Sequence, residues 1–154
     1  MSQRKSYLEK LQENAQQGDP ESQFLLGHQY YEGESLKQNY KNAIKWFHLA
    51  AEQGHDNAQL FLGIIYLWGE GTKANIKTAF KWFKKASRSG NEYAQFNIAM
   101  AYIFGFEEIP MDFRKANEWF KKSAKGGHRG AQYMLGDSYQ SGRGIKQNLE
   151  LASY

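Results

Sequence analysis

Histidine offers this chain its widest choice of chemistry, because it can bind a metal ion or act as a general base near neutral pH. The chain contains four of them: His28, His48, His55 and His128. None has the His-Glu-x-x-His spacing, or another pattern, that holds a metal ion. His55 and His128 occupy equivalent places in similar stretches of sequence, so we interpret both as polar residues of turns.

Other patterns that carry catalysis or bind a cofactor are incomplete. Glu107 and Glu108 are neighbours, and adjacent carboxylates alone do not make an acid–base pair. The glycine turns at residues 69–71 and 142–144 suggest phosphate loops, but no Gly-Lys-Ser or Gly-Lys-Thr follows them. The absence of cysteine excludes disulfides, thiolate catalysis and cysteine-bound zinc. We therefore predict no catalytic residue, no metal and no cofactor.

Composition bounds the class of protein. The 154 residues have room for one domain, and 41% hydrophobic with 16% aromatic residues is enough for a packed core. A net charge of +4 does not favour nucleic acid as a partner without a concentrated basic patch. No stretch is apolar enough to span a membrane, and residues 1–17 lack the apolar region of a signal peptide. We expect a cytoplasmic protein, although a processed mature chain or a protein exported without a signal would look similar.

The elements that must position any functional residue repeat along the chain. A large aliphatic residue followed by a small one recurs as Leu26-Gly27, Leu62-Gly63, Ile98-Ala99 and Leu135-Gly136. The pair Trp-Phe recurs at residues 46–47, 82–83 and 119–120. Ala43, Ala79, Ala116 and Ala152 are separated by 36, 37 and 36 residues. The extra residue of the third repeat falls in residues 106–111, where a loop is expected. Such periodicity predicts a stack of small helical units.

Each repeat contains two helices, which we call the A helix and the B helix. The first A helix should begin at Asp19-Pro20, since Asp favours the N-cap position and Pro the first helical position. The B helices should begin after Asn39, Asn75, Asp112 and Asn148, and Gly54, Gly90 and Gly127 should end the first three. Ser6 and Glu9 form a capping-box pattern that predicts a further helix over residues 6–17, capping the stack.

The resulting pattern resembles the Sel1-like repeats, relatives of the tetratricopeptide repeats, most clearly at residues 43–55, 57–71 and 79–86. This resemblance implies an all-α fold, an α-solenoid in which antiparallel helix pairs stack into a right-handed superhelix. Its A helices would line a concave groove. We expect a single repeat domain, 1–154, divided into a capping helix (1–18), repeat 1 (19–54), repeat 2 (55–90), repeat 3 (91–127) and an incomplete repeat 4 (128–154).

The groove is the predicted binding site. Comparison with tetratricopeptide repeats places the groove-facing residues two positions before and after the recurring Leu, and just after the recurring Tyr. The apolar and aromatic candidates at these positions are Phe24, Leu60, Ile64, Leu67, Trp68, Phe96, Met100, Ile103, Phe104 and Tyr133. The alternative is that these side chains fill the space between helices. Eight of them fall in repeats 2 and 3, and an exposed apolar patch of that size is typical of a binding site.

A second surface is basic. Seven cations lie on the B helices of repeats 2 and 3, off the Trp-Phe core: Lys81, Lys84, Lys85, Arg88, Lys121, Lys122 and Lys125. We interpret them first as a solvated outer face. A functional role would be contact with an acidic protein, an anionic lipid or nucleic acid.

The predicted function is a non-enzymatic adaptor or scaffold that binds a protein or peptide in the groove. We expect its source to be a bacterium. Repeat 4 stops before its Trp-Phe, so the face with Leu135 and Tyr139 should lack a covering helix and permit self-association. Two alternatives stay open. One is a hydrolase of cell-wall fragments or β-lactams, as the resemblance to a disulfide-bearing branch suggests; the other is a self-assembling structural module.

Overall fold

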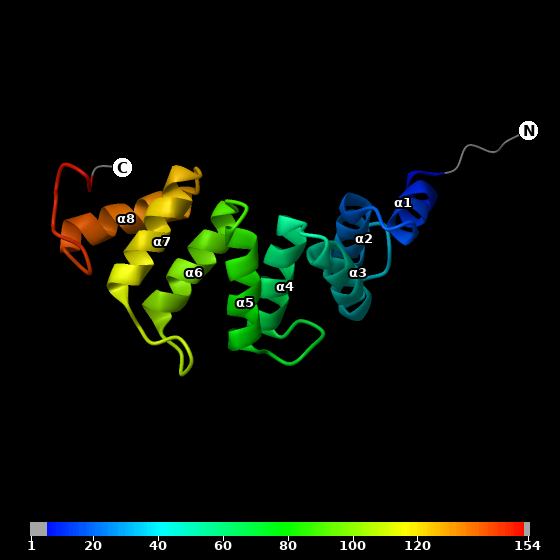
Figure 1. The fold of residues 1–154 in the computed structure, drawn as a ribbon, viewed down its shortest axis with the longest axis horizontal. Helices are drawn as coiled ribbons and strands as arrows, with labels where there is room; N and C mark the ends of the chain where they lie inside the picture. The colour runs from blue at the N-terminus through cyan, green and yellow to red at the C-terminus, as the bar shows by residue number, and fades with distance from the viewer. Residues whose placement is uncertain (1–5, 153–154) are drawn as a thin grey trace, which may run out of the picture. The chain divides into compact units, whose positions relative to one another are not determined.

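The computed structural model describes residues 6–152, and its regular structure there is helical apart from one β-bridge between Phe106 and Ile109. This confirms the all-α prediction. The helices are α1 (Tyr7–Gln16), α2 (Pro20–Glu32), α3 (Tyr40–Glu52), α4 (Asp56–Trp68), α5 (Ile76–Ser87), α6 (Glu92–Phe104), α7 (Phe113–Lys125) and α8 (Arg129–Ser141) (Figure 1).

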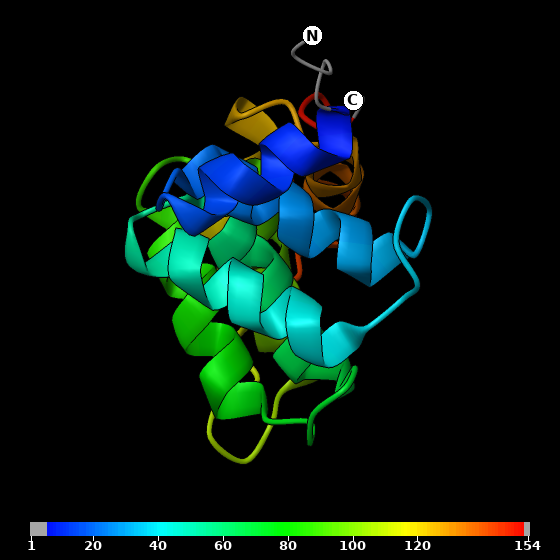
Figure 2. The same ribbon diagram turned by 90° about the vertical axis from the view of Figure 1, so that its right-hand side faces the viewer.

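Two compact units divide the chain, one holding α1 to α4 and ending at Asn75, the other beginning at Ile76 and holding α5 to α8. Consecutive helices pack against each other within each unit. Figure 2 shows the antiparallel course of α2 and α3, which the loop after Gly33 connects. Each of the two units is therefore built from the same helix–turn–helix element.

The A helices begin with the same hydrogen bond in all four repeats. Backbone N–H groups of Ser22, Ala58, Ala94 and Ala131 donate to side chains three residues earlier, at 2.8, 3.2, 3.0 and 3.1 Å. The acceptors are Asp19, His55, Asn91 and His128. The Asp19-Pro20 start is confirmed. His55 and His128 lie in the turns between repeats, as predicted, and the Nδ1 of each also caps the helix that follows, which was not predicted.

The B helices begin where the sequence predicts. Asn39 and Asp112 accept from backbone N–H groups three residues later, both at 3.0 Å, and α5 starts directly after Asn75. Asn148 accepts from the N–H groups of Glu150 and Leu151 in a turn at the position where a fourth B helix was predicted. The capping box of Ser6 and Glu9 is also confirmed at the start of α1.

One backbone hydrogen bond recurs in the connection that follows the A helix of every repeat. The N–H of each B-helix cap donates to the carbonyl of the recurring A-helix tyrosine, at 2.8, 2.7, 2.9 and 2.9 Å. The pairs are Asn39 with Tyr30, Asn75 with Tyr66, Asp112 with Tyr102, and Asn148 with Tyr139. The extra residue of repeat 3 lies between the bonded residues, and Figure 1 shows its loop at the end of α6 and α7. The insertion therefore leaves the start of α7 unchanged.

Small residues let paired helices approach closely. A Cβ on Gly27 would lie 2.8 Å from a ring carbon of Phe47, which is fully buried, so this position has no room for a side chain. Leu11 and Ala15 of α1 pack with Leu26 of α2 in the core of the first unit. The core of the second unit contains Ala99, Ala116, Phe120, Ala131 and Leu135.

Repeat 4 has no second helix among the described residues, as predicted, but Leu135 is nevertheless buried. Leu135 is 8% exposed and belongs to the same cluster as Phe120, with Ile145 packed against it. The residues after α8 fold back, so that the carbonyl oxygen of Ala152 lies 3.2 Å from the place of a Cβ on Gly136. The turn at Asn148 thus covers part of the face that a full B helix would cover.

Candidate functional site

Three of the predicted groove residues are strongly exposed. Trp68 on α4 is 72% exposed, Phe104 on α6 is 65% exposed and Tyr133 on α8 is 74% exposed. Trp68 and Phe104 occupy the same position of repeats 2 and 3, the last residue of the A helix before a glycine. The corresponding residues of repeats 1 and 4 are Glu32 and Ser141, so the aromatic pair is confined to the middle repeats.

Leu60 is a correction to the predicted groove. It is only 6% exposed and belongs to the core, so a ligand does not have access to it. Six of the thirteen residues of α4 are buried, including Gln59, Leu60 and Leu62. The buried arc of this helix is therefore wider than the recurring Leu-Gly-Tyr stripe.

Phe24 and Phe96 are half-buried and pack between consecutive A helices. The ring of Phe24 stacks on His55 with 4.6 Å between centroids, and the ring of Phe96 stacks on His128 with 4.3 Å. Each phenylalanine thus contacts the imidazole that caps the next A helix. These contacts occupy one side of both rings with structural packing.

The other four predicted residues are also half-buried: Ile64, Leu67, Met100 and Ile103. Met100 and Ile103 pack against the core of the second unit. They present part of their surface to solvent and could extend a contact made by a more exposed neighbour.

The capping hydrogen bonds of His55 and His128 require one protonation state of the imidazole ring. A ring nitrogen that accepts a hydrogen bond from a backbone N–H carries no proton, so Nδ1 of His55 and of His128 must be unprotonated. His55 completes the arrangement by donating from Nε2 to Glu21 at 2.9 Å. Burial lowers the pKa of His128, and the nearby Glu92 opposes that shift. Both caps therefore need the neutral ring, with its proton on Nε2.

Tyr31 shows how an A helix is tied to the following repeat. Its hydroxyl donates to the carboxylate of Glu70 at 2.8 Å. Burial raises the pKa of Tyr31, and the hydrogen bond to Glu70 raises it further. The hydroxyl therefore stays protonated and serves as a structural donor.

Residues 6–152 contain no cluster of three or more His, Asp or Glu side chains placed to hold a metal ion. Among the helices of these residues, none combines the length and the hydrophobicity needed to cross a membrane.

Comparison with known proteins identifies the repeats. The family model described as the Sel1 repeat matches residues 20–55, 56–91, 92–128 and 130–152. A search of curated proteins found no match. Similar solved structures include c5321, a protective antigen present in uropathogenic Escherichia coli strains that displays an SLR fold, with a TM-score of 0.90 and 32% identity. A Sel1 repeat protein from Oxalobacter formigenes has a TM-score of 0.87 and 31% identity.

These relatives are longer than the present chain. The match covers 96% of this chain but 32% of the Escherichia coli protein, and 94% of this chain but 57% of the Oxalobacter protein. Helicobacter pylori cysteine rich protein B shares the fold, with a TM-score of 0.65 over 84% of this chain and 98% of its own, at 19% identity. The α-solenoid prediction is confirmed.

Proteins with this fold generally mediate protein–protein interaction, and most are not enzymes. Four matched repeats cover most of the sequence, in register with the four A-helix caps. The chain belongs to the Sel1 repeat family.

Proposed function

We propose that this chain is an adaptor that binds a protein or peptide partner through exposed apolar side chains of its A helices. The observation that carries the proposal is the exposure of Trp68 and Phe104, two large aromatic residues at equivalent positions of consecutive repeats. Aromatic residues of this kind are enriched among those that dominate the energy of protein interfaces.

Stable binding also requires contacts from residues next to Trp68 and Phe104. Burying two exposed aromatic side chains contributes about 3 to 6 kcal/mol. Association costs about 4 to 15 kcal/mol in lost translational and rotational freedom. The two aromatic residues alone therefore do not hold a partner, and the half-buried Ile64, Leu67, Met100 and Ile103 would supply further contact area. Tyr133 would extend the surface on α8.

The proposal also includes the organism class from which the chain comes and a choice between the two alternative functions. The relatives from Escherichia coli and Oxalobacter formigenes support a bacterial source. The hydrolase alternative has no observation in its favour. Self-association through repeat 4 is less favoured than binding at the A helices, because Leu135 is covered.

The test replaces both aromatic side chains. In W68A/F104A, each truncation should cost about 2 kcal/mol of binding free energy, which corresponds to a weakening of about thirtyfold per residue. Affinity capture with the native chain should retain a partner that W68A/F104A loses, and titration calorimetry with the purified partner should measure the difference in Kd.

A matched control removes an equally exposed aromatic residue elsewhere. Tyr7 on α1 is 69% exposed and was not predicted to line the groove. The Y7A variant should bind the partner as the native chain does, and circular dichroism should show the same helicity for all three proteins. Unchanged affinity in W68A/F104A would refute the proposal.

A further inference from the structure

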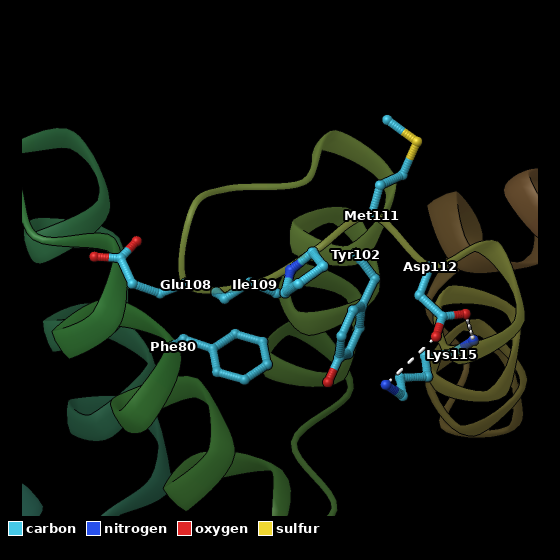
Figure 3. Close-up of a pocket in the computed structure, with 8 residues that line it drawn as sticks. Phe80, Tyr102, Glu108, Ile109, Met111, Asp112 and Lys115 are labelled. Carbon is cyan, nitrogen blue, oxygen red and sulfur yellow. Dashed lines mark hydrogen bonds and ion pairs between the residues drawn. The ribbon is translucent and has the colours of Figure 1, made fainter.

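The insertion in repeat 3 creates a small cavity within the second unit. The cavity has a volume of about 180 Å³ and lies where α5 and α6 meet the segment at residues 108–112 (Figure 3). Phe80 and Tyr102 form one wall, with their rings edge to face at 5.7 Å. Ile109, which is buried, and Pro110 close it from the loop. The walls are therefore mainly apolar.

The size of this cavity limits what it can hold. Pockets for cofactors and drug-sized ligands usually enclose about 300 to 1,000 Å³. A cavity of about 180 Å³ is too small for such a molecule. It has room for one apolar side chain, which is how many peptides anchor to their receptors.

Two ammonium groups lie over the ring of Trp119, and one of them also lies near Phe80 in the cavity wall. The Nζ atoms of Lys84 on α5 and Lys122 on α7 each lie 4.2 Å from the ring centroid of Trp119. Lys84 also lies 5.3 Å from the ring of Phe80, the cavity wall. No described carboxylate is within ion-pair distance of either lysine. Lys115, at the rim, differs because it pairs with Asp112 at 3.4 Å.

The positive charges around Trp119 are close enough together to lower the pKa of one of the lysines. Burial lowers the pKa of Lys84, and the charges of Lys122 and Lys115 lower it further. An incoming carboxylate would relieve that repulsion as well as form its own ion pair.

We propose that this surface, made of the cavity with Lys84, Lys122 and Trp119, binds a short acidic segment of a partner protein. One apolar side chain of the segment enters the cavity against Phe80 and Tyr102. Carboxylates flanking that side chain pair with Lys84 and Lys122.

The chemistry favours an acidic peptide over nucleic acid. Proteins that bind single strands offer open aromatic faces on which bases stack, whereas ammonium groups contact the ring of Trp119. Glu108 and Asp112 also line the rim and repel carboxylates as well as phosphates, so the segment must place its carboxylates on the Trp119 side of the cavity. A peptide meets these constraints with one side chain and two well-placed carboxylates.

This surface is separate from the one proposed above for the A helices. Tyr102 and Phe104 are two residues apart on α6, and two residues of an α-helix subtend about 200°. The wall of the cavity and the exposed Phe104 therefore point to opposite sides of the same helix. The two surfaces can be tested independently.

The probes are three synthetic pentapeptides titrated into the full ¹⁵N-labelled chain. Asp-Glu-Leu-Glu-Asp should shift the amide signals of residues 80–84, 109 and 119–122. The same peptide with a central Ala should bind about tenfold more weakly, because it loses the buried apolar contact. Lys-Lys-Leu-Lys-Lys should produce no saturable shift. Equal affinity of the Leu and Ala peptides, or binding of the basic peptide, would overturn the proposal.

The variants test the two ammonium groups with a matched control. K84Q/K122Q keeps most of each side-chain stem and should weaken the acidic leucine peptide by about tenfold or more, because two charge-assisted contacts are lost. K37Q/K41Q removes the same net charge from exposed positions in the other unit and should change the affinity by less than about twofold. Equal weakening in the two variants would contradict the proposal.

Two further measurements separate the sources of binding. W68A/F104A should bind the acidic leucine peptide as the native chain does, so this surface and the A-helix proposal fail independently. A single-stranded oligonucleotide and phosphatidylglycerol vesicles should each bind more weakly than the acidic peptide. Tighter binding of either, abolished in K84Q/K122Q, would assign the lysines to that ligand and overturn the proposal.

Discussion

Histidine takes the place of Asp or Asn as the cap of two A helices in this chain. The substitution preserves the hydrogen bond to the backbone, because a neutral imidazole accepts through Nδ1 as a carboxylate or amide oxygen does. It also makes the start of α8 dependent on protonation. A second proton on the ring would occupy the nitrogen that accepts from the helix.

This cap predicts a pH-dependent stability for the second unit. The pKa of His128 in the folded chain lies below its ordinary value of 6.5, so the unfolded chain takes up the proton first as the pH falls. The stability contributed by the cap is therefore complete above pH 6.5 and decreases as the pH drops through that value. Urea unfolding at several pH values between 8 and 5, followed by circular dichroism, should show this loss.

The control variant replaces His128 with asparagine, the residue type that caps the A helix of repeat 3. Asn91 occupies the same position there and does not titrate. H128N should retain the stability of the native chain near pH 8 and lose less of it on acidification, whereas H128A should cost about 1 kcal/mol at every pH above the transition. Parallel pH profiles for the native chain and H128N would rule out this role for His128.

The caps also show how far single residues could be predicted. Asp19, Asn39 and Asp112 were predicted because Asp and Asn are favoured at helix starts. His55, Asn91 and His128 were missed, and a histidine cap is rare enough that its residue type gives no signal. Their register with Asp19, at intervals of 36, 36 and 37 residues, was the signal that could have revealed them.

At the scale of elements, the close approach of α2 and α3 depends on Gly27. A methyl group there would overlap the ring of Phe47, which is fully buried and has no space to move into. Overpacking of this kind costs about 1 to 3 kcal/mol. The gain in helix propensity from Gly to Ala offsets about 1 kcal/mol of that cost. We expect G27A to be less stable than the native chain by up to about 2 kcal/mol.

Gly136 provides the comparison at the same position of repeat 4. Its nearest neighbour is the carbonyl oxygen of Ala152, in a terminal turn that can yield. G136A should therefore be neutral or slightly stabilising when G27A, G136A and the native chain are compared by thermal unfolding. A G27A variant as stable as the native chain would show that the α2–α3 packing is looser than the structure indicates.

Helix positions followed from sequence more readily than loop conformation did. The period, the caps and the glycines located α1 to α8, because each signal acts within one repeat. The insertion in repeat 3 was correctly assigned to a loop. Its cavity was not foreseen, since the burial of Ile109 depends on a fold-back through Phe106 and on side chains of α5 and α6.

At the scale of the whole molecule, stability in a repeat array is mainly a sum of terms between neighbours. Phe120 on α7 is fully buried within the second unit. Truncation of such a residue costs about 3 to 5 kcal/mol. F120A should accelerate amide hydrogen exchange strongly in α6, α7 and α8 and least in α1, whereas E118A, at an exposed position of the same helix, should leave exchange unchanged. Uniform acceleration along the chain would indicate one cooperative unit.

The candidate site was harder to predict than the fold for a reason that belongs to this scale. Position in a repeat identified Trp68, Phe104 and Tyr133 as exposed, but it assigned Leu60 to the same surface. Exposure depends on how much of a helix its neighbours cover, and that differs between the interior and the ends of a stack. Lys84 and Lys122 were assigned to a solvated face, and only the packing of α5 against its neighbours brings both of them to Trp119.

The hydrogen bond between each B-helix cap and the A-helix tyrosine has a consequence for protein engineering. In repeat 3 it persists between Asp112 and Tyr102 although the intervening loop is longer. The connection between the helices of a repeat is thus a place where foreign sequence could be grafted while the scaffold keeps its geometry. A library randomised at the exposed residues 107, 108 and 110 would vary recognition on a constant helical frame, since Phe106 and the buried Ile109 hold the loop in place.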